Sequence, residues 1–262
     1  LDIGNIRIQP SELAKPIIIL WVARQLSNEK IKEHDLKTIW RAGFIPGLAV
    51  ILIFLQPDFG TTATIAFIVF IQFLFSKTKL IYPALLSIGG WFIGRYFLES
   101  EFYRAERLRV WSEGICNQGQ ELLGACFQVH QSRIAISSGG MFGLGPGTSR
   151  ARWGSLPSAY SDFISSIIGE EYGFIGYLIF IFILSICIIT FFLIAVREKN
   201  EFKKIFISGL GAWILFQSVL NLGASVYLLP ITGIVLPFVS YGGTAMVSIF
   251  VALGIMHCRV DE

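Results

Sequence analysis

Long apolar stretches without charged residues constrain this chain more than any other feature of its sequence. A helix needs about 20 such residues to cross a lipid bilayer. Seven apolar spans can be identified: Leu13–Leu26, Trp40–Leu55, Phe59–Phe75, Leu80–Leu98, Tyr172–Val196, Ile205–Leu229 and Ile234–His257. The spans are continuous and do not alternate between apolar and polar residues, so they predict helices and not the strands of a barrel.

The composition also indicates a membrane protein. Of the 262 residues, 54% are hydrophobic and only 15% are charged, which is too little charge to cover the surface of a soluble domain of this size. We therefore predict an all-α polytopic membrane protein with about seven transmembrane helices, forming a single membrane domain over residues 1–262. No stretch is basic enough, or both basic and aromatic, to predict nucleic-acid binding.

Basic residues in the short loops predict the orientation of the chain. They follow the first, third and fifth spans, at Lys30, Lys32, Lys37, Arg41, Lys77, Lys79, Arg197, Lys199, Lys203 and Lys204. The short turns on the opposite side, Gln56–Asp58 and Pro230–Gly233, contain none. By the positive-inside rule the basic loops face the cytoplasm, and the large loop Glu99–Glu171 then faces outward.

Four polar clusters lie at the predicted outer ends of the spans. They are Glu12 with Lys15, Asp58, Asp162 with Glu170 and Glu171, and the segment Leu236–Thr244 with Ser240. Ionisable groups beside the bilayer usually have a partner or a task, so four clusters on one side predict a polar cavity that opens outward. The alternative is that each cluster is an independent cap or turn; Asp162, for example, could cap a helix that starts at Phe163.

The outer loop contains two further groups with open interpretations. Arg104, Arg107 and Arg109 have near-helical spacing and form either a solvated helix face or a phosphate-binding cluster. Cys116 and Cys126 share this loop; we expect two free thiols, and a disulfide is the alternative if the loop faces an oxidising compartment. The His, Cys and acidic residues nowhere have the spacing of metal ligands.

Six motifs follow one another along almost the whole chain. They are Gln9–Lys15, Gln56–Thr61, Tyr103–Leu108, Gln131–Gly140, Asp162–Ile164 with Gly169–Glu171, and Leu236–Gly243. In this order they resemble the SEDS family (shape, elongation, division and sporulation), the RodA- and FtsW-type bacterial cell-wall proteins. The resemblance implies a fold of ten membrane helices, of which this chain has the last seven, so we expect a fragment of a longer protein. Phe59 and the run Gly143–Ser149 favour the FtsW type.

The resemblance implies a peptidoglycan glycosyltransferase. Such an enzyme polymerises lipid II, a disaccharide-pentapeptide on undecaprenyl pyrophosphate, at the outer face of the bacterial cytoplasmic membrane during division or elongation. The family's catalytic aspartate matches Asp162, and its Gln-Pro-Ser-Glu and Ser-Tyr-Gly-Gly motifs match Glu12, Lys15 and Ser240. The chain departs from the family where Pro157–Asp162 replaces the frequent Pro-Glu-Ala-His-Thr-Asp, so the roles of that Glu and His do not carry over.

The residue chemistry fits this activity. Asp162 can act as the base that takes a proton from the acceptor hydroxyl. The predicted substrate-binding residues are Glu12, Lys15, Asp58, Arg104, Arg109 and Ser240. Positive charge for the leaving pyrophosphate comes from these lysine and arginine side chains or from a divalent cation, Mg²⁺ or Mn²⁺; no organic cofactor is expected.

Partners and competing functions follow from the same family. The resemblance implies a class B penicillin-binding protein, a transpeptidase, and other membrane proteins of the division or elongation machinery as partners. The alternatives are a flippase for lipid II and a non-catalytic scaffold for a transpeptidase. The spans Tyr172–Val196 and Ile205–Leu229 contain no Asp, Glu, Lys or Arg, which favours a polymerase over a polar route through the bilayer.

Overall fold

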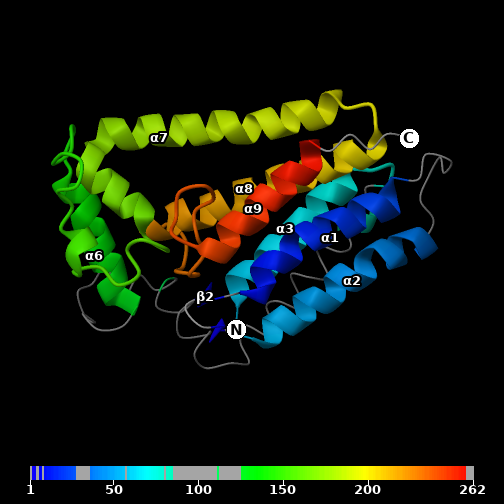
Figure 1. The fold of residues 1–262 in the computed structure, drawn as a ribbon, viewed down its shortest axis with the longest axis horizontal. Helices are drawn as coiled ribbons and strands as arrows, with labels where there is room; N and C mark the ends of the chain where they lie inside the picture. The colour runs from blue at the N-terminus through cyan, green and yellow to red at the C-terminus, as the bar shows by residue number, and fades with distance from the viewer. Residues whose placement is uncertain are drawn as a thin grey trace. The chain divides into compact units, whose positions relative to one another are not determined.

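The part of the protein that the structure describes is mainly helical (Figure 1). The computed structural model describes residues 2–3, 6–7, 9–27, 36–56, 58–79, 81–84, 111 and 125–257. Its helices are α1 (Pro10–Leu26), α2 (Leu36–Leu55), α3 (Phe59–Phe75), α6 (Ala125–Ser138), the 3-10 helix η2 (Ala151–Trp153), α7 (Ile164–Arg197), α8 (Glu201–Ser225) and α9 (Gly243–His257). Near the start of the chain, β1 (Asp2–Ile3) and β2 (Ile6–Arg7) pair as a short antiparallel hairpin.

The predicted spans correspond closely to these helices. Helix α3 has the predicted bounds, and α1 and α2 end at the predicted residues. Within the described part of the chain, α2, α7 and α8 are long and apolar enough to cross a membrane, and α3 and α9 are shorter apolar helices. The predicted span Leu80–Leu98 lies outside the described residues except for the helical residues 81–84.

The predicted start of the last span, Ile234, is wrong. Helix α9 begins at Gly243, and residues 231–236 form no regular structure. Pro237 explains the difference, because proline lacks an amide hydrogen and disfavours helical geometry in the residue before it. Phe238 then takes a left-handed φ of 67°, which no continuous helix allows.

Helix α7 contains a break at Gly173. The helix runs over 34 residues, but Gly173 has φ 68° and ψ −170°, and Figure 1 shows the helix changing direction near its start. A side chain at this position would place a Cβ 2.3 Å from the amide nitrogen of Gly143, so only glycine fits. The segment before the break lies within the predicted outer loop 99–171, which therefore ends in helix.

The loop 140–145 fills the break in α7. Its amides at positions 144 and 145 donate to the carbonyls of Glu170 and Glu171, both at 3.0 Å. In return, the amides of residues 174 and 175 donate to the carbonyls of residues 140 and 141, at 2.8 and 3.2 Å. The loop thus supplies partners for the backbone groups that the broken helix cannot pair internally.

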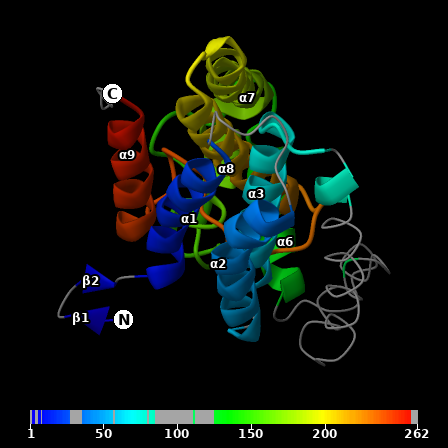
Figure 2. The ribbon, with the colours of Figure 1, turned by 90° about the vertical axis from the view of Figure 1, so that its right-hand side faces the viewer.

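The chain forms two compact units. The first consists of Leu1–Ile93, Cys187–Phe216 and Gly242–Glu262. Within it, α1 packs against α2, α3 and α9, which lie beside it in Figure 2. The buried Gln72 side chain of α3 donates to the carbonyl of Ile19 at 2.9 Å and to that of Ile205 at 3.3 Å. One amide group therefore connects three helices, as polar side chains often do between membrane helices.

The second unit consists of Gly94–Ile186 and Gln217–Tyr241. A buried hydroxyl group connects its helices: Ser132 of α6 shares a hydrogen bond of 2.6 Å with Ser166 of α7 and donates to the carbonyl of Ser225 in α8, also at 2.6 Å. A small apolar core lies beside these bonds and is formed by Ala135, Ala151, Leu156, Ala159, Phe163 and Ile167. This core supports the turn that bears Asp162. The prediction of a single membrane domain stays a prediction.

Candidate active site

Asp162 lies at the end of a tight turn in the second unit. Ser158 has a left-handed φ of 56°, and its carbonyl accepts from the amides of Ser161 at 3.2 Å and Asp162 at 3.0 Å. From α8, the Asn221 side chain donates to the carbonyl of Asp162 at 2.8 Å and to that of Ile234 at 2.7 Å. These bonds fix the backbone of Asp162 and do not involve its carboxylate.

Asp162 does not occupy the cap position of α7. The helix begins at Ile164 and not at Phe163, so Phe163 is the residue directly before it. The capping interpretation was wrong because the turn at Ser158 continues through Asp162 and delays the helix. The carboxyl group is half-buried, and burial raises its pKa above the usual range, opposed by a hydrogen bond with Ser161. Removal of water disfavours the charged form and makes the group a better proton acceptor.

Ser240 packs against the turn of Asp162. Its hydroxyl donates to the carbonyl of Ser161 and accepts from the amide of Leu236 at 2.8 Å. The next amide, that of Tyr241, donates to the carbonyl of Tyr160 at 2.9 Å. The structure therefore places two predicted site residues, Asp162 and Ser240, in adjacent backbone segments, where Ser240 positions the residue just before Asp162.

Glu170 has a different environment from Asp162. It is 2% exposed, and its carboxylate accepts from Ser149 Oγ at 2.6 Å, the amides of residues 150 and 151 at 3.1 and 3.2 Å, and Ser138 Oγ at 3.3 Å. Such a set of donors satisfies a buried carboxylate without a cation. Glu170 therefore holds the loop before η2 against α7. Glu171 is also buried, with Oε1 unpartnered among the described residues.

Three predicted substrate-binding residues lie in the first unit. Lys15 is fully buried, its Nζ lies 2.6 Å from Glu12 Oε1, and it lies 5.4 Å from the centre of the Trp213 ring. Asp58 caps α3, because its Oδ1 accepts from the amide of Thr61 at 3.0 Å. Capping does not exclude a role with substrate, which stays a prediction. Arg104, Arg107 and Arg109 lie outside the described residues.

The cysteines correct one expectation. Cys126 is disulfide-bonded, so the prediction of free thiols in the outer loop is wrong for this residue. Its partner lies outside the described residues, as do Cys116 and Cys258. Cys187 in α7 has a free thiol. A disulfide-bonded cysteine is typical of a segment that faces an oxidising compartment, which agrees with the outward orientation predicted for the segment of Cys126.

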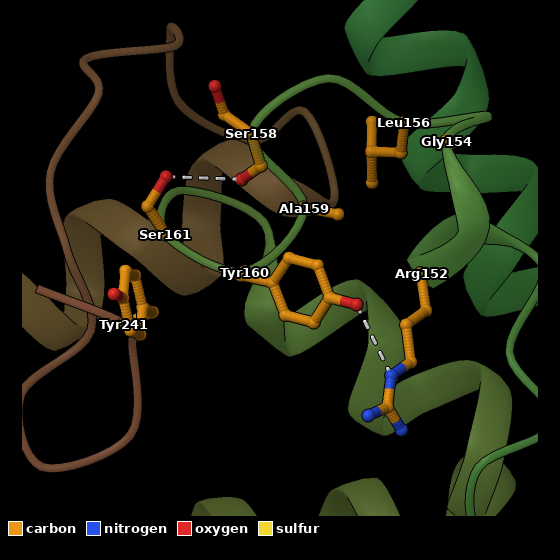
Figure 3. Close-up of a pocket in the computed structure, with 8 residues that line it drawn as sticks. All are labelled: Arg152, Gly154, Leu156, Ser158, Ala159, Tyr160, Ser161 and Tyr241. Atoms are coloured by element: carbon orange, nitrogen blue, oxygen red, sulfur yellow. Dashed lines mark hydrogen bonds between the residues drawn. The ribbon is translucent and has the colours of Figure 1, made fainter.

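A pocket of about 310 Å³ opens on the turn that bears Asp162. Figure 3 shows the residues around it, with the side chains of Arg152 and Tyr160 at one end and the ring of Tyr241 on a separate loop. The Nε of Arg152 donates to the hydroxyl of Tyr160 at 3.3 Å. The remaining lining residues are Gly154, Leu156, Ser158, Ala159 and Ser161.

Among the described residues, no three or more His, Cys, Asp and Glu side chains lie close enough together to hold a metal ion. They therefore offer no complete protein cage for a cation. Mg²⁺, however, is commonly held by one or two carboxylates together with substrate phosphates and water, and Asp162 is a carboxylate of that kind. A divalent cation at Asp162 would therefore share its ligands with the substrate, and its presence stays a prediction.

The comparisons with known proteins identify the family. The family model FTSW_RODA_SPOVE, described as cell cycle protein, matches residues 1–261. The chain belongs to this family. Among curated relatives, it is 35% identical to the probable peptidoglycan glycosyltransferase FtsW of Bacillus subtilis over 97% of this chain and 64% of that protein. It is 31% identical to stage V sporulation protein E of the same organism, over 98% of this chain and 69% of that protein.

Solved structures support the same fold. RodA, the rod shape determining protein of Thermus thermophilus, is 25% identical over 98% of this chain and 66% of its own, with a TM-score of 0.58. A chain from a study of polymerization and crosslinking by a peptidoglycan synthase complex matches with a TM-score of 0.69 and 23% identity. The match covers 98% of this chain and 70% of the other. This member of the FtsW/RodA/SpoVE family is thus an all-α, multi-pass membrane protein. It spans about two thirds of the length of these relatives.

Sequence reasoning missed several residues of the second unit. Arg152 and Tyr160 form a pair, and Asn221 fixes the turn of Asp162 from α8. Glu170 was grouped with Asp162 in one polar cluster, although it accepts bonds from Ser149. Ser149 lies shortly before η2, but its carboxylate partner in α7 could not be read from local spacing.

Proposed function

We propose that this protein is a peptidoglycan glycosyltransferase of the FtsW type, which polymerises lipid II at the outer face of the bacterial cytoplasmic membrane. The observation that carries the proposal is Asp162: a half-buried carboxyl group with a raised pKa, fixed by backbone contacts to the Ser240 segment. Both residues lie in the motifs that resemble the family's catalytic motifs. The relatives named peptidoglycan glycosyltransferase support the reaction class.

Asp162 acts as the general base in a single displacement. Its carboxylate takes the proton of the acceptor sugar hydroxyl while that oxygen forms a bond to the anomeric carbon of the donor. The bond from this carbon to the pyrophosphate oxygen breaks, and the lipid pyrophosphate leaves with the electron pair. The anomeric centre is inverted, which gives a β-linkage. The raised pKa suits this role, because a stronger base takes up the proton more readily.

Positive charge must stabilise the departing pyrophosphate. Lys15, Arg104 and Arg109 are the proposed cations, with Glu12 and Asp58 in the same substrate-binding set. The ammonium group of Lys15 has three donors, and one serves Glu12 at 2.6 Å. A divalent cation, Mg²⁺ or Mn²⁺, bound by one carboxylate and the phosphate oxygens, would supply the same charge.

The proposed setting follows from the family. The chain acts with a class B penicillin-binding protein, which crosslinks the strands that the polymerase makes, and with other membrane proteins of the division or elongation machinery. The basic loops after spans one, three and five face the cytoplasm, and residues 99–171 face outward, where the substrate's sugars are. The disulfide of Cys126 supports this orientation.

The deciding experiment is lipid II chain extension by the purified full-length protein with its partner. Asp162→Asn keeps the size of the side chain but cannot take up a proton as a carboxylate does, so the rate should fall by about 10² to 10⁴. Glu198→Gln, the same change after the end of α7, is the matched control and should leave the rate unchanged. Normal glycan synthesis by the Asn variant would overturn the role of Asp162.

The same assay separates the competing functions. It runs in detergent micelles, where there is no bilayer to cross, so a flippase would make no glycan at all. A scaffold would make none either, and its partner's crosslinking would be unaffected by Asp162→Asn. Polymerisation by the wild-type protein in a complex with an inactivated transpeptidase, lost in the Asn variant, is the result expected here.

A further inference from the structure

We propose that the pocket beside Asp162 binds the pyrophosphate of the lipid-linked substrate through Arg152, with Tyr160 as the residue that positions the guanidinium group. This inference rests on the proposed function and adds a binding residue and a positioning residue to it. The pocket volume of about 310 Å³ is at the small end of ligand pockets. It suits one charged group of a larger substrate and not the whole molecule.

The guanidinium group of Arg152 is held at one edge and open at the other. Its Nε donates to the hydroxyl of Tyr160 at 3.3 Å. In Figure 3 the two terminal nitrogens point away from Tyr160 and from the turn. Among the described residues, no carboxylate forms an ion pair with Arg152. A guanidinium group with its forked donors free is the side chain best suited to two oxygens of a phosphate.

The backbone beneath Arg152 is rigidly fixed. Arg152 lies in η2, and its amide donates to Ser149 Oγ at 3.3 Å. Ser149 Oγ donates in turn to Glu170 at 2.6 Å, and the amides of residues 150 and 151 donate to the same carboxylate. A buried acid in α7 thus anchors the short helix that carries the cation. Because this short helix is already anchored, it loses less conformational entropy when a ligand binds.

Aromatic rings complete the pocket. The Arg152 guanidinium lies 6.0 Å from the centre of the Tyr160 ring and 5.8 Å from that of Trp153, within the range of a cation–π contact. Tyr241 is 83% exposed and lines the same pocket from another loop. Its amide is bonded to the carbonyl of Tyr160, so the two tyrosines are held together.

The pocket shares its backbone with the base. Ser158 and Ser161 line the pocket, and the carbonyl of Ser158 holds the amide of Asp162 at 3.0 Å. A donor bound through its pyrophosphate at Arg152 would lie against the turn that bears the group that takes up the acceptor's proton.

The test measures binding of undecaprenyl pyrophosphate, which carries neither sugar nor peptide, to the full-length protein with its partner. Arg152→Gln should weaken binding by about tenfold to 100-fold, the effect of losing charge-assisted hydrogen bonds. Arg152→Lys should lose only severalfold, because it keeps the charge without the fork. Arg150→Gln is the matched control: its side chain is exposed and outside the pocket, and binding should not change.

Tyr160→Phe tests the positioning role. It keeps the ring and removes the hydroxyl, so binding should weaken severalfold in the wild-type background and not at all in Arg152→Gln. Equal losses in both backgrounds would show that Tyr160 does not act through Arg152. Unchanged binding of undecaprenyl pyrophosphate by Arg152→Gln would overturn the assignment. If the same variant also had a raised KM for lipid II, its contact would be to the sugar or the peptide and not to the pyrophosphate.

The two proposals fail in different ways. A wild-type protein that makes no glycan from lipid II would contradict the polymerase, whatever the pyrophosphate binding shows. A wild-type protein that makes glycan, together with an Arg152→Gln variant that binds undecaprenyl pyrophosphate normally, would leave the polymerase standing and contradict the pocket assignment.

Discussion

Asp162 and Glu170 are acids of the same polar stretch, and the fold gives them opposite surroundings. Glu170 is buried, and hydroxyl and amide donors surround its carboxylate. Asp162 is half-buried, and burial raises its pKa while only the bond with Ser161 acts in the other direction. In Glu170, fixed hydrogen-bond donors replace the water that burial removes. In Asp162, burial removes water and only the bond with Ser161 replaces it.

The difference between the two acids shows that burial alone does not identify a functional carboxylate. A buried carboxylate with fixed donors has its hydrogen bonds satisfied and serves the structure. A carboxylate that has lost water is a better proton acceptor, which is the property a general base needs. Burial alone would have selected Glu170 as the active-site acid. Its donors show instead that Glu170 anchors the loop before η2, while Asp162 is the acid that we propose as the base.

The largest expected effect on stability is that of Glu170→Ala. The change leaves the hydroxyl of Ser149 and the amides of residues 150 and 151 without their acceptor. Each unpaired buried group costs about 1–3 kcal/mol, so the total loss should be at least about 3 kcal/mol. Thermal unfolding in detergent measures it, with Glu198→Ala as the control. An unchanged Tm would mean that Glu170 is not an anchor.

Ser240→Ala should have a smaller effect on both stability and rate. The variant loses the hydroxyl that bridges Leu236 and Ser161, which should cost about 1–3 kcal/mol. The turn of Asp162 should then shift, and chain extension should slow by roughly tenfold, because small displacements of catalytic groups are costly. Ser240→Thr keeps a hydroxyl and should recover most of the rate. Wild-type activity in Ser240→Ala would remove Ser240 from the site.

The smallest expected effect is on pH dependence. The base must be ionised, so the rate should fall as the pH drops through the raised pKa of Asp162. Stability has the opposite sign: a folded-state pKa above the unfolded one means that the folded protein binds more protons, so stability falls as the pH rises through this range. Rate and Tm measured from acidic to neutral pH should therefore change in opposite directions. A parallel change would contradict the assignment.

The helices could be predicted from the sequence because the bilayer imposes length and apolarity on each span. Helix α3 has the bounds that hydropathy gave. The start of α9 could not be placed this way, because residues 234–239 are as apolar as a helix and only Pro237 marks them as a turn. The break at Gly173 was also missed, because its requirement for glycine arises from contact with Gly143, far away in sequence.

The candidate site could be predicted from the sequence only in part. Asp162 and Ser240 could be selected because their motifs are local. Their contact depends on how the segments before α7 and α9 meet, and the fixed geometry comes from Asn221 in α8. The Arg152–Tyr160 bond depends on the turn at Ser158. Hydrogen bonds between distant segments leave no pattern in a single sequence.

The most direct test of the account is a paired measurement on two amide variants, Asp162→Asn and Glu170→Gln. Chain-extension rate and Tm are measured on the same preparations of the full-length complex. Asp162→Asn should lose about 10² to 10⁴ in rate and keep or raise its Tm, since the cost of a desolvated charge is removed. Glu170→Gln should lower the Tm, because its amide group turns N–H bonds toward donors. A stable Asp162→Asn variant with the wild-type rate would contradict the account.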